Sequence, residues 1–183
     1  TNMSDHQIEH TLCLQKHMPL NCEDSKPWIN FITLTQFPKR EKMLQEAVSS
    51  FIALEYARKI ITIVNDGAPC TFSEAFSQNY CGCVVNIASK ASLGQKRNIG
   101  AQQLAGVEWV FTMDDDDFSF PERINLQLEK VGNGVYHRSG VVFIAKDDIH
   151  NVIGQQLGSY FASSMVKRQV ALEMPWPDVD WCE

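Results

Sequence analysis

Short apolar runs alternate with segments of helical periodicity between Ile29 and Val131, and this alternation constrains the fold more than any other feature. Strands are predicted at 29–35, 60–64, 84–88 and 108–113, and helices at 39–56, at 95–104 and after Pro121. The predicted strands are almost continuously apolar, which is typical of a sheet covered on both faces. The pattern therefore predicts an α/β fold with a mixed, largely parallel sheet and helices on both faces.

Two changes in the composition of the sequence divide the chain. Apolar residues are sparse before Trp28, so residues 1–27 are expected to form an N-terminal arm. Residues 28–183 are expected to form a single domain, in which Gly132-Asn133-Gly134 separates a first half, 28–131, from a second half, 132–183. Weaker patterns predict strands at 135–137, 141–145 and 162–166, and short helices at 73–80 and 167–173.

Composition excludes several classes of protein. Of the 183 residues, 44% are hydrophobic and 21% are charged, which excludes a disordered chain, a collagen and a coiled coil. The net charge of -6 argues against nucleic acid as a partner. We expect no transmembrane segment and no secretory leader, because the apolar stretches are too short. The six cysteines are expected to be reduced thiols, and we expect a cytoplasmic location.

Four consecutive aspartates, Asp114–Asp117, directly follow the strand predicted at 108–113. Adjacent carboxylates about 6 Å apart repel by about 3 kcal/mol at an effective dielectric constant of about 20, so the run needs a cation, raised pKa values or open water. A solvated acidic loop is one interpretation. Ligands bind at the carboxyl ends of strands in open α/β sheets, and oxygen ligands suit Mg²⁺ or Mn²⁺. We therefore favour a divalent-metal site.

Residues 110–121, Val-Phe-Thr-Met-Asp-Asp-Asp-Asp-Phe-Ser-Phe-Pro, resemble the Asp-x-Asp-Asp-x-x-x-Pro segment of family-two-type glycosyltransferases with the GT-A fold. Three further segments resemble that family's motifs in the same order: Thr35-Gln36-Phe37, Val64-Asn65-Asp66-Gly67 and Gly94–Gly100. The resemblance covers about residues 29–130. The chain departs from the family at Pro38, where Asn is usual, and at Asn65, where Asp is usual.

The resemblance implies the Rossmann-like GT-A fold of nucleotide-diphospho-sugar transferases, with 28–131 as the nucleotide-sugar-binding half and 132–183 as the acceptor-side half. It implies that Mn²⁺ or Mg²⁺ binds to Asp114 and Asp116. The register stays open by one residue, because Asp115 and Asp117 also form an Asp-x-Asp pair, although the spacing to Pro121 favours the first pair. The residues that the resemblance places at the nucleotide-sugar are Thr35, Phe37, Asp66, Lys96, Arg97, Asp114 and Asp115.

Several of these assignments have a plainer alternative. Phe37 is placed to stack on the nucleotide base, but a core aromatic at a strand end explains it equally well. Asp66 would accept a hydrogen bond from the base or ribose, or else bond to its own turn. Lys96 and Arg97 are predicted in the first turn of a helix, where cations are disfavoured unless an anion binds nearby, so either they contact a diphosphate or they are a solvated pair. Asn98 is expected to hold the loop through bonds to backbone.

Glycosyl transfer also needs a base that removes the proton of the acceptor hydroxyl. The family usually supplies an aspartate well downstream of the metal motif. The candidates here are Asp178, Asp180 and Glu183, which lie among tryptophans, and Asp180 is our choice. The resemblance thus implies a metal-dependent transferase that moves a sugar, most readily from a UDP-sugar, to a saccharide or another hydroxyl acceptor with inversion.

Two other functions fit parts of the sequence. A non-catalytic module that binds a nucleotide-sugar or a divalent ion needs no base, and a phosphohydrolase also uses an Asp-x-Asp pair after an apolar strand. His6 and His10 have a spacing that could bind zinc, but a polar arm explains them. His137 and Arg138 could contact the donor sugar or the acceptor, or form a hairpin corner. We also expect the chain to be a fragment of a longer protein, because it looks short for the family, begins at Thr1 without Met and ends at Glu183, where more sequence would be expected.

Overall fold

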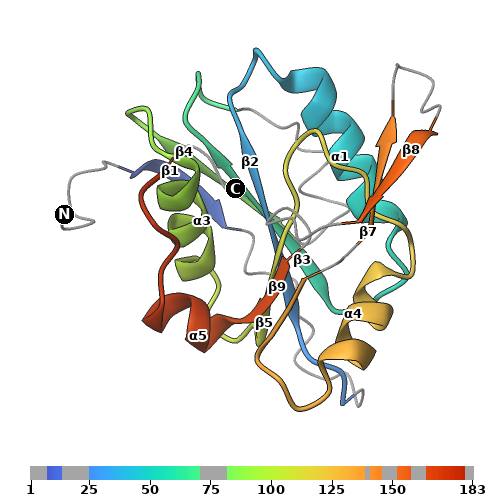
Figure 1. Ribbon diagram of the computed structural model, residues 1–183. Coiled ribbons are helices and arrows are strands. Elements are labelled where there is room, and N and C mark those ends of the chain that lie inside the picture. The colour runs from blue at the N-terminus through green and yellow to red at the C-terminus, as the bar shows by residue number, and fades with distance from the viewer. Residues whose placement is uncertain are drawn as a thin grey trace.

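A seven-stranded sheet lies at the centre of the computed structural model, which describes residues 8–13, 25–70, 82–138, 141–145, 152–157 and 164–179 (Figure 1). The strand order in the sheet is β1-β4-β3-β2-β5-β9-β6. The strands of the sheet are β1 (Ile8–Cys13), β2 (Ile29–Thr35), β3 (Lys59–Asn65), β4 (Gly82–Ile87), β5 (Trp109–Thr112), β6 (Tyr136–Arg138) and β9 (Ser164–Lys167). A separate antiparallel pair consists of β7 (Val141–Ala145) and β8 (Val152–Leu157).

The middle of the sheet is parallel. Strand β2 pairs in parallel with β3 on one side and with β5 on the other, and β3 pairs in parallel with β4. Strand β1 forms one edge and pairs antiparallel with β4. On the other side, β9 pairs antiparallel with β5, and the edge strand β6 pairs antiparallel with β9. All residues of β2 are buried, because helices cover both faces. This arrangement confirms the predicted mixed, largely parallel sheet.

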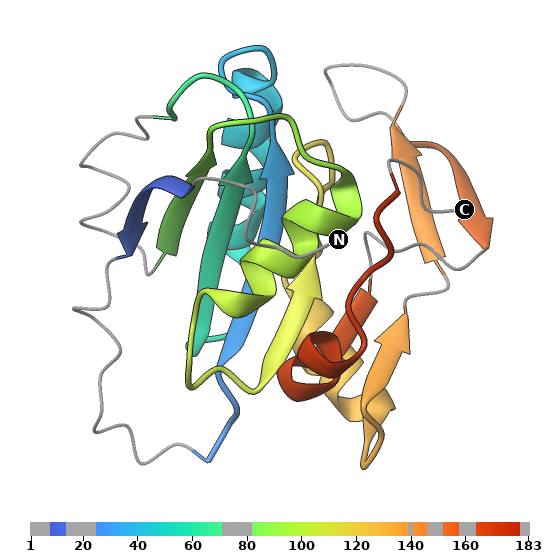
Figure 2. The same ribbon diagram turned by 90° about the vertical axis from the view of Figure 1, so that its left-hand side faces the viewer.

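Among the described residues, four helices form the layers on the two faces of the sheet (Figures 1 and 2). Helices α1 (Glu41–Ala53) and α4 (Arg123–Val131) cover one face, where Phe31 of β2 packs against Phe51 and Phe111 with ring centroids 5.6 and 5.0 Å apart. Helices α3 (Leu93–Gln102) and α5 (Arg168–Glu173) cover the other face. Successive side chains of β2 therefore point to different hydrophobic clusters, as the alternation of a strand requires.

Helix α3 packs directly on the central strand at Gly100. A Cβ atom added to Gly100 would lie 2.6 Å from Ile32 Cγ2, so a larger residue there would force the Ile32 side chain to move. The side chain of Asn30 on β2 donates to the Gly100 carbonyl at 3.3 Å, which joins the two elements through a polar bond as well. The first turn of α3 is therefore held at the carboxyl ends of the parallel strands.

Most of the predicted elements are present, with shifted ends. Helix α3 begins two residues earlier than predicted, at Leu93 rather than at residue 95. Strand β1 forms within the residues expected to be an arm, and it pairs with β4. The helix predicted at 73–80 lies outside the described residues. In the part of the chain that the structure describes, no helix has both the length and the apolar character needed to cross a membrane.

Candidate functional site

The acidic run forms a closed turn after the carboxyl end of β5. The backbone N–H of Asp117 donates to the Asp114 carbonyl at 3.0 Å, and the N–H of Asp114 donates to Asp117 Oδ2 at 2.9 Å. Burial raises the pKa of Asp117 to about 7, and burial also raises the pKa of Asp114. The side chains are not equivalent: the exposed fraction is 29% for Asp114, 3% for Asp115 and 56% for Asp116.

Asp115 is the buried carboxylate of the run, and an arginine neutralises it. Arg40, the residue before α1, donates from Nε to both carboxylate oxygens at 2.8 Å and from Nη2 to Oδ1 at 2.6 Å. Thr35 Oγ1 at the end of β2 donates to Asp115 Oδ2 at 2.8 Å. Arg40 Nη2 also reaches Asp116 Oδ2 at 2.8 Å. These bonds, with that to Asp115 foremost, raise the pKa of Arg40 above its usual value.

Two further cations come from the start of α3. Ser92 caps this helix: its Oγ accepts from the backbone of Gln95 at 3.1 Å, and the Gln95 side chain accepts from the backbone of Ser92 at 2.9 Å. One turn later, Lys96 Nζ lies 3.2 Å from Asp66 Oδ1, and Arg97 Nη2 lies 3.1 Å from Asp114 Oδ1. Both basic side chains are buried and paired, so the alternative of a solvated basic pair does not describe them.

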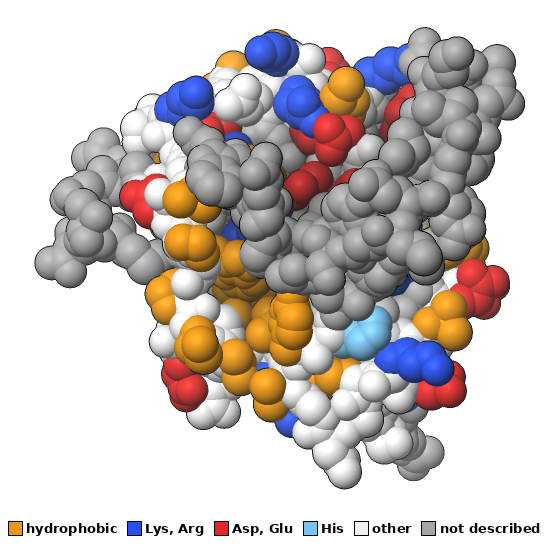
Figure 3. All heavy atoms as spheres, viewed as in Figure 1, with side chains coloured by type: hydrophobic (Ala, Val, Ile, Leu, Met, Phe, Trp, Pro, Cys, Tyr) orange, Lys and Arg blue, Asp and Glu red, His pale blue; other side chains and the backbone are white. Residues whose placement is uncertain are grey.

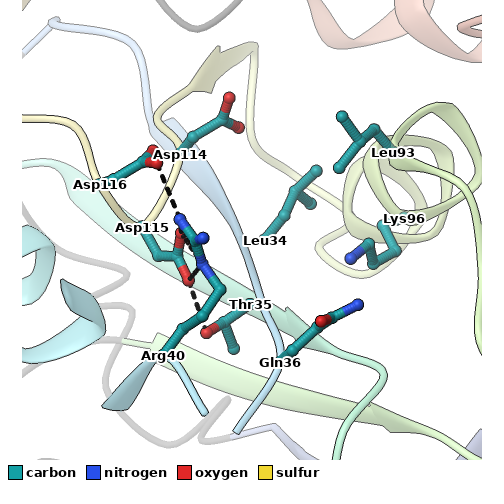
Figure 4. Close-up of a pocket in the computed structure, with 9 residues that line it drawn as sticks. All are labelled: Leu34, Thr35, Gln36, Arg40, Leu93, Lys96, Asp114, Asp115 and Asp116. Atoms are coloured by element: carbon teal, nitrogen blue, oxygen red, sulfur yellow. Dashed lines mark hydrogen bonds and ion pairs between the residues drawn. The ribbon is translucent and has the colours of Figure 1, made fainter. Parts of the chain in front are cut away.

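These groups surround a pocket of about 300 Å³ at the carboxyl ends of the parallel strands. Figure 4 shows Arg40 directed at Asp115 and Asp116, with Lys96 and Leu93 of α3 on the opposite side. Figure 3 shows acidic side chains beside basic ones in the upper part of that face of the molecule. The residues that line the pocket are Leu34, Thr35, Gln36, Arg40, Leu93, Lys96, Asp114, Asp115 and Asp116.

Asn65, which stands where the family usually has aspartate, stabilises the Val-Asn-Asp-Gly turn and the segments beside it. Asn65 Oδ1 accepts from the backbone N–H groups of Phe37 at 2.9 Å and Gly67 at 3.0 Å. Asn65 Nδ2 donates to the Ala68 carbonyl at 2.7 Å and to Asn86 Oδ1 at 2.8 Å. An ionised aspartate could not donate the last two bonds. Asn65 thus ties the end of β3 to both neighbouring segments.

Arg123 on α4 supports the acidic turn, and the sequence analysis did not identify it. Its guanidinium lies over the rings of Phe31 and Phe111, 5.5 and 5.7 Å from their centroids. It donates to the Thr112 carbonyl and to Ser119 Oγ, both at 2.8 Å, and these two residues flank the run of aspartates. Burial lowers the pKa of Arg123 to about 10.

The predicted site residues separate into those at the pocket and those away from it. Asp66 is fully buried and accepts from Lys96 and from the Ala91 backbone N–H at 3.2 Å, so its carboxylate is already engaged. Phe37 packs, partly buried, against the core cluster on the α1 side. Arg97 contacts the pocket through Asp114. The predicted residues that line the pocket are Thr35, Lys96, Asp114, Asp115 and Asp116.

The residues predicted to act as the base or to contact the acceptor do not line the pocket where the structure describes them. Asp180 and Glu183 lie outside the described residues. Asp178 is exposed and accepts from Gln95 Nε2 at 2.9 Å. His137 of β6 lies 3.3 Å from the side-chain nitrogen of Gln127 on α4, which is a contact between two structural elements.

The donor set of the pocket fits a divalent ion that is shared with a ligand. Within the described residues, no group of three or more His, Cys, Asp or Glu side chains is arranged to hold a metal by itself. Mg²⁺ typically takes one or two carboxylates and completes its shell with water and phosphate oxygens. Asp114 and Asp116 accept bonds from Arg97 and Arg40, but their side chains are partly exposed at the pocket, whereas Asp115 is buried beneath Arg40 and Thr35.

The fold is similar to that of several solved structures, one of which is a mannosyltransferase. Two structures of S. aureus TarS, one of residues 1–349 and one in complex with UDP-GlcNAc, match 82% of this chain at 16% and 17% identity with TM-scores of 0.60. The mannosyltransferase PcManGT from Pyrobaculum calidifontis, in complex with GDP-Man and Mn2+, matches 84% at 14% identity with a TM-score of 0.60. This chain covers 50%, 48% and 48% of those chains, so it spans about half the length of the structures it matches.

Comparison by sequence gives the family. No curated protein matches the chain significantly. The family profile described as glycosyl transferase family 2 matches residues 37–172. That range begins just after β2 and includes the acidic turn and helices α1, α3 and α4. The chain therefore belongs to glycosyl transferase family 2.

Proposed function

We propose that this chain is the nucleotide-sugar-binding part of a glycosyltransferase that moves a sugar from a nucleotide-diphosphate donor to an acceptor hydroxyl. The pocket carries the proposal: Asp114 and Asp116 line one side, and Lys96 lines the other. A carboxylate pair opposite a lysine suits a diphosphate that shares a divalent ion with the protein. The structures of TarS with UDP-GlcNAc and of PcManGT with GDP-Man and Mn2+ support a donor of this class.

In this proposal, Asp114 and Asp116 hold Mn²⁺ or Mg²⁺, which when bound neutralises charge on the departing diphosphate. Lys96 adds a positive charge near the same oxygens, and Arg97 holds Asp114 in place. Thr35 and Asp115 also line the pocket, and the nucleotide is proposed to lie toward Phe37 and Asp66. A UDP-sugar is the proposed donor, and a saccharide or another hydroxyl compound is the proposed acceptor.

The proposed reaction is a single displacement. The acceptor oxygen attacks the anomeric carbon while the bond from that carbon to the diphosphate oxygen breaks, and the electron pair leaves with the diphosphate. The acceptor proton passes to a carboxylate of the acceptor side, for which Asp180 is proposed ahead of Asp178 and Glu183. Attack from the face opposite the leaving group inverts the configuration of the sugar.

Thermal unfolding with nucleotide ligands tests the proposal. UDP, GDP, UDP-GlcNAc and GDP-mannose are each added with and without Mn²⁺. A ligand at about 100 times its Kd stabilises a protein by about 2.7 kcal/mol, which raises Tm by about 5–10 °C for a chain of this size. We expect one nucleotide to give such a shift only in the presence of Mn²⁺. Asp116→Asn should remove the Mn²⁺-dependent part, and Glu129→Gln, an exposed change on α4, should not.

Two results would contradict the proposal. One is the absence of any shift with all four nucleotides in the presence of Mn²⁺. The other is an undiminished Mn²⁺-dependent shift in Asp116→Asn. Nucleotide release from the bound donor then separates an enzyme from a module that only binds, because a module returns the nucleotide-sugar intact.

A further inference from the structure

The segment Trp176–Val179, which follows α5, lies against the first turns of α3. Asn98 of α3 makes a two-way contact with the backbone of Trp176: its Nδ2 donates to the carbonyl at 2.9 Å, and its Oδ1 accepts from the N–H at 2.8 Å. This pairing satisfies both backbone polar groups of one residue with a single side chain, as a strand partner would. The Trp176 ring adds packing, partly buried, against the hydrophobic cluster on the α3 side of the sheet.

Two other residues of α3 shape the same contact. A Cβ atom added to Gly94 would lie 1.8 Å from the Pro177 carbonyl oxygen, so the segment passes where only glycine leaves room. The Gly94 backbone N–H points to the Val179 carbonyl at 3.4 Å, and Gln95 Nε2 donates to Asp178 Oδ2 at 2.9 Å. The contact therefore extends over four consecutive residues of the segment.

The contact with Trp176–Val179 and the pocket lie on different faces of helix α3. Residues three or four apart share one face of a helix. Gly94, Gln95 and Asn98 share the face that holds Trp176–Val179. Leu93 and Lys96 line the pocket, and Arg97 contacts Asp114 there. One short helix thus holds the candidate phosphate-binding side chains and the segment that leads into the acceptor-side carboxylates.

We propose that Asn98 is a positioning residue that fixes Trp176–Val179 at a set distance from the donor pocket. The proposal rests on the proposed function, because it assigns the acceptor side to this part of the chain. Helix α3 is a rigid reference, since the Ser92 cap holds its start and Gly100 packs directly on Ile32. Displacing a group near a reacting centre by about 1 Å can lower the rate by about 10²-fold without weakening substrate binding.

Asn98→Ala is the variant that tests this, and Asn125→Ala is its matched control. Asn125 also donates from Nδ2 to a backbone carbonyl of another element, that of Glu55 at 3.0 Å, but it lies on α4. Gly94→Ala is a second variant, because its new methyl group displaces the segment while Asn98 remains. Hydrogen exchange at the Trp176 amide reports the contact directly. Bound Mn²⁺ broadens nearby NMR signals, so it reports the distance from the metal to Val179.

In the wild type with UDP and Mn²⁺, we expect slow exchange at Trp176. In Asn98→Ala and Gly94→Ala, exchange at Trp176 should accelerate at least ten-fold, and Mn²⁺ broadening at Val179 should change. In both variants, broadening at Thr35 and the affinity for UDP should stay within about two-fold of the wild-type values. Turnover of a bound nucleotide-sugar should fall at least ten-fold, while the KM for the donor stays unchanged. Asn125→Ala should behave as the wild type does.

Three results would overturn the inference: unchanged exchange and broadening in Asn98→Ala, unchanged turnover despite a released segment, or a loss of UDP affinity as large as that in Lys96→Ala. The last result would mean that Asn98 acts on the donor pocket rather than on the segment. Failure of the wild type to bind UDP with Mn²⁺ is a different outcome. It overturns the proposed function, while exchange at Trp176 still shows whether Asn98 holds the segment.

Discussion

Replacing Arg40 with methionine should destabilise the protein strongly, although Arg40 lies at a pocket and not in the core. Methionine keeps much of the length and apolar surface of the side chain but removes the guanidinium. The Asp115 side chain is only 3% exposed. Without Arg40 it would keep its hydrogen bond from Thr35 but lose the charge that neutralises it. A carboxylate left buried without its counter-charge is among the most destabilising changes in a fold.

The structure gives the magnitude. Removing one partner of a buried ion pair costs about 3–5 kcal/mol. The Arg40 side chain is 32% exposed, so water can replace part of what it supplies. We therefore expect Arg40→Met to lower the free energy of unfolding by about 2–4 kcal/mol. Asp115→Asn should cost less, because the amide oxygen still accepts from Thr35 and Arg40 keeps its bond to Asp116 at 2.8 Å.

Urea unfolding at pH 7.5 without divalent ions measures both variants and the double variant. If the pair is coupled, Asp115→Asn should recover at least about 1 kcal/mol of the loss in the Arg40→Met background. Lys39→Met is the matched control, since Lys39 is the exposed neighbour. The reasoning fails if Arg40→Met costs no more than Lys39→Met, or if the effects of Arg40→Met and Asp115→Asn simply add.

Three other predictions concern the scaffold. Burial lowers the pKa of Lys59 to about 8, so between pH 8 and pH 10.5 the unfolded chain holds a proton that the folded chain has lost, and stability should rise with pH. Relative to Lys59→Met, the free energy of unfolding of the wild type should rise by about 1 kcal/mol over that range, after allowance for the partial exposure of Lys59. Urea unfolding at several pH values measures this difference. A difference that stays flat or falls with pH would contradict the prediction. Ser92→Ala removes the cap of α3 and should cost about 1 kcal/mol, whereas Ser92→Thr should cost less in the same unfolding assay. Arg123→Met should cost about 2–4 kcal/mol and weaken Mn²⁺ binding in calorimetry, because the acidic turn loses the bonds from Arg123 to the Thr112 carbonyl and to Ser119. Full Mn²⁺ affinity would show that the turn does not depend on Arg123.

The order and type of the central elements could be predicted because they depend on local patterns. In β2, seven consecutive residues are buried, and a continuous apolar run with β-branched residues predicts such a strand. The start of α3 was also visible in principle. Ser92 and Gln95 have the spacing of a capping box, and this spacing places the first helical residue at Leu93.

The partner of the acidic run could not be predicted, because it depends on which strands are neighbours. Arg40 and Asp115 are 75 residues apart, and they meet because β2 pairs with β5 in the middle of the sheet. Four adjacent carboxylates need a cation, raised pKa values or open water, and the sequence does not show which of the basic residues would lie near them. The structure shows that Arg40 and Arg97 bond to the run itself.

The contacts of the four aspartates divide them into two pairs, one that supports the fold and one that is exposed at the pocket. Asp115 and Asp117 serve the fold, because one joins Thr35 to Arg40 and the other closes the turn on the Asp114 backbone. Asp114 and Asp116 also pair with arginines, but their side chains remain partly exposed at the pocket, where we propose that they hold the metal ion. Neutralising Asp115 should therefore change the free energy of unfolding in metal-free buffer, whereas neutralising Asp116 should chiefly change stability in the presence of Mn²⁺. If both changes had the same effect in both buffers, the run would act as one diffuse charge, and the alternation of its roles would have no physical basis.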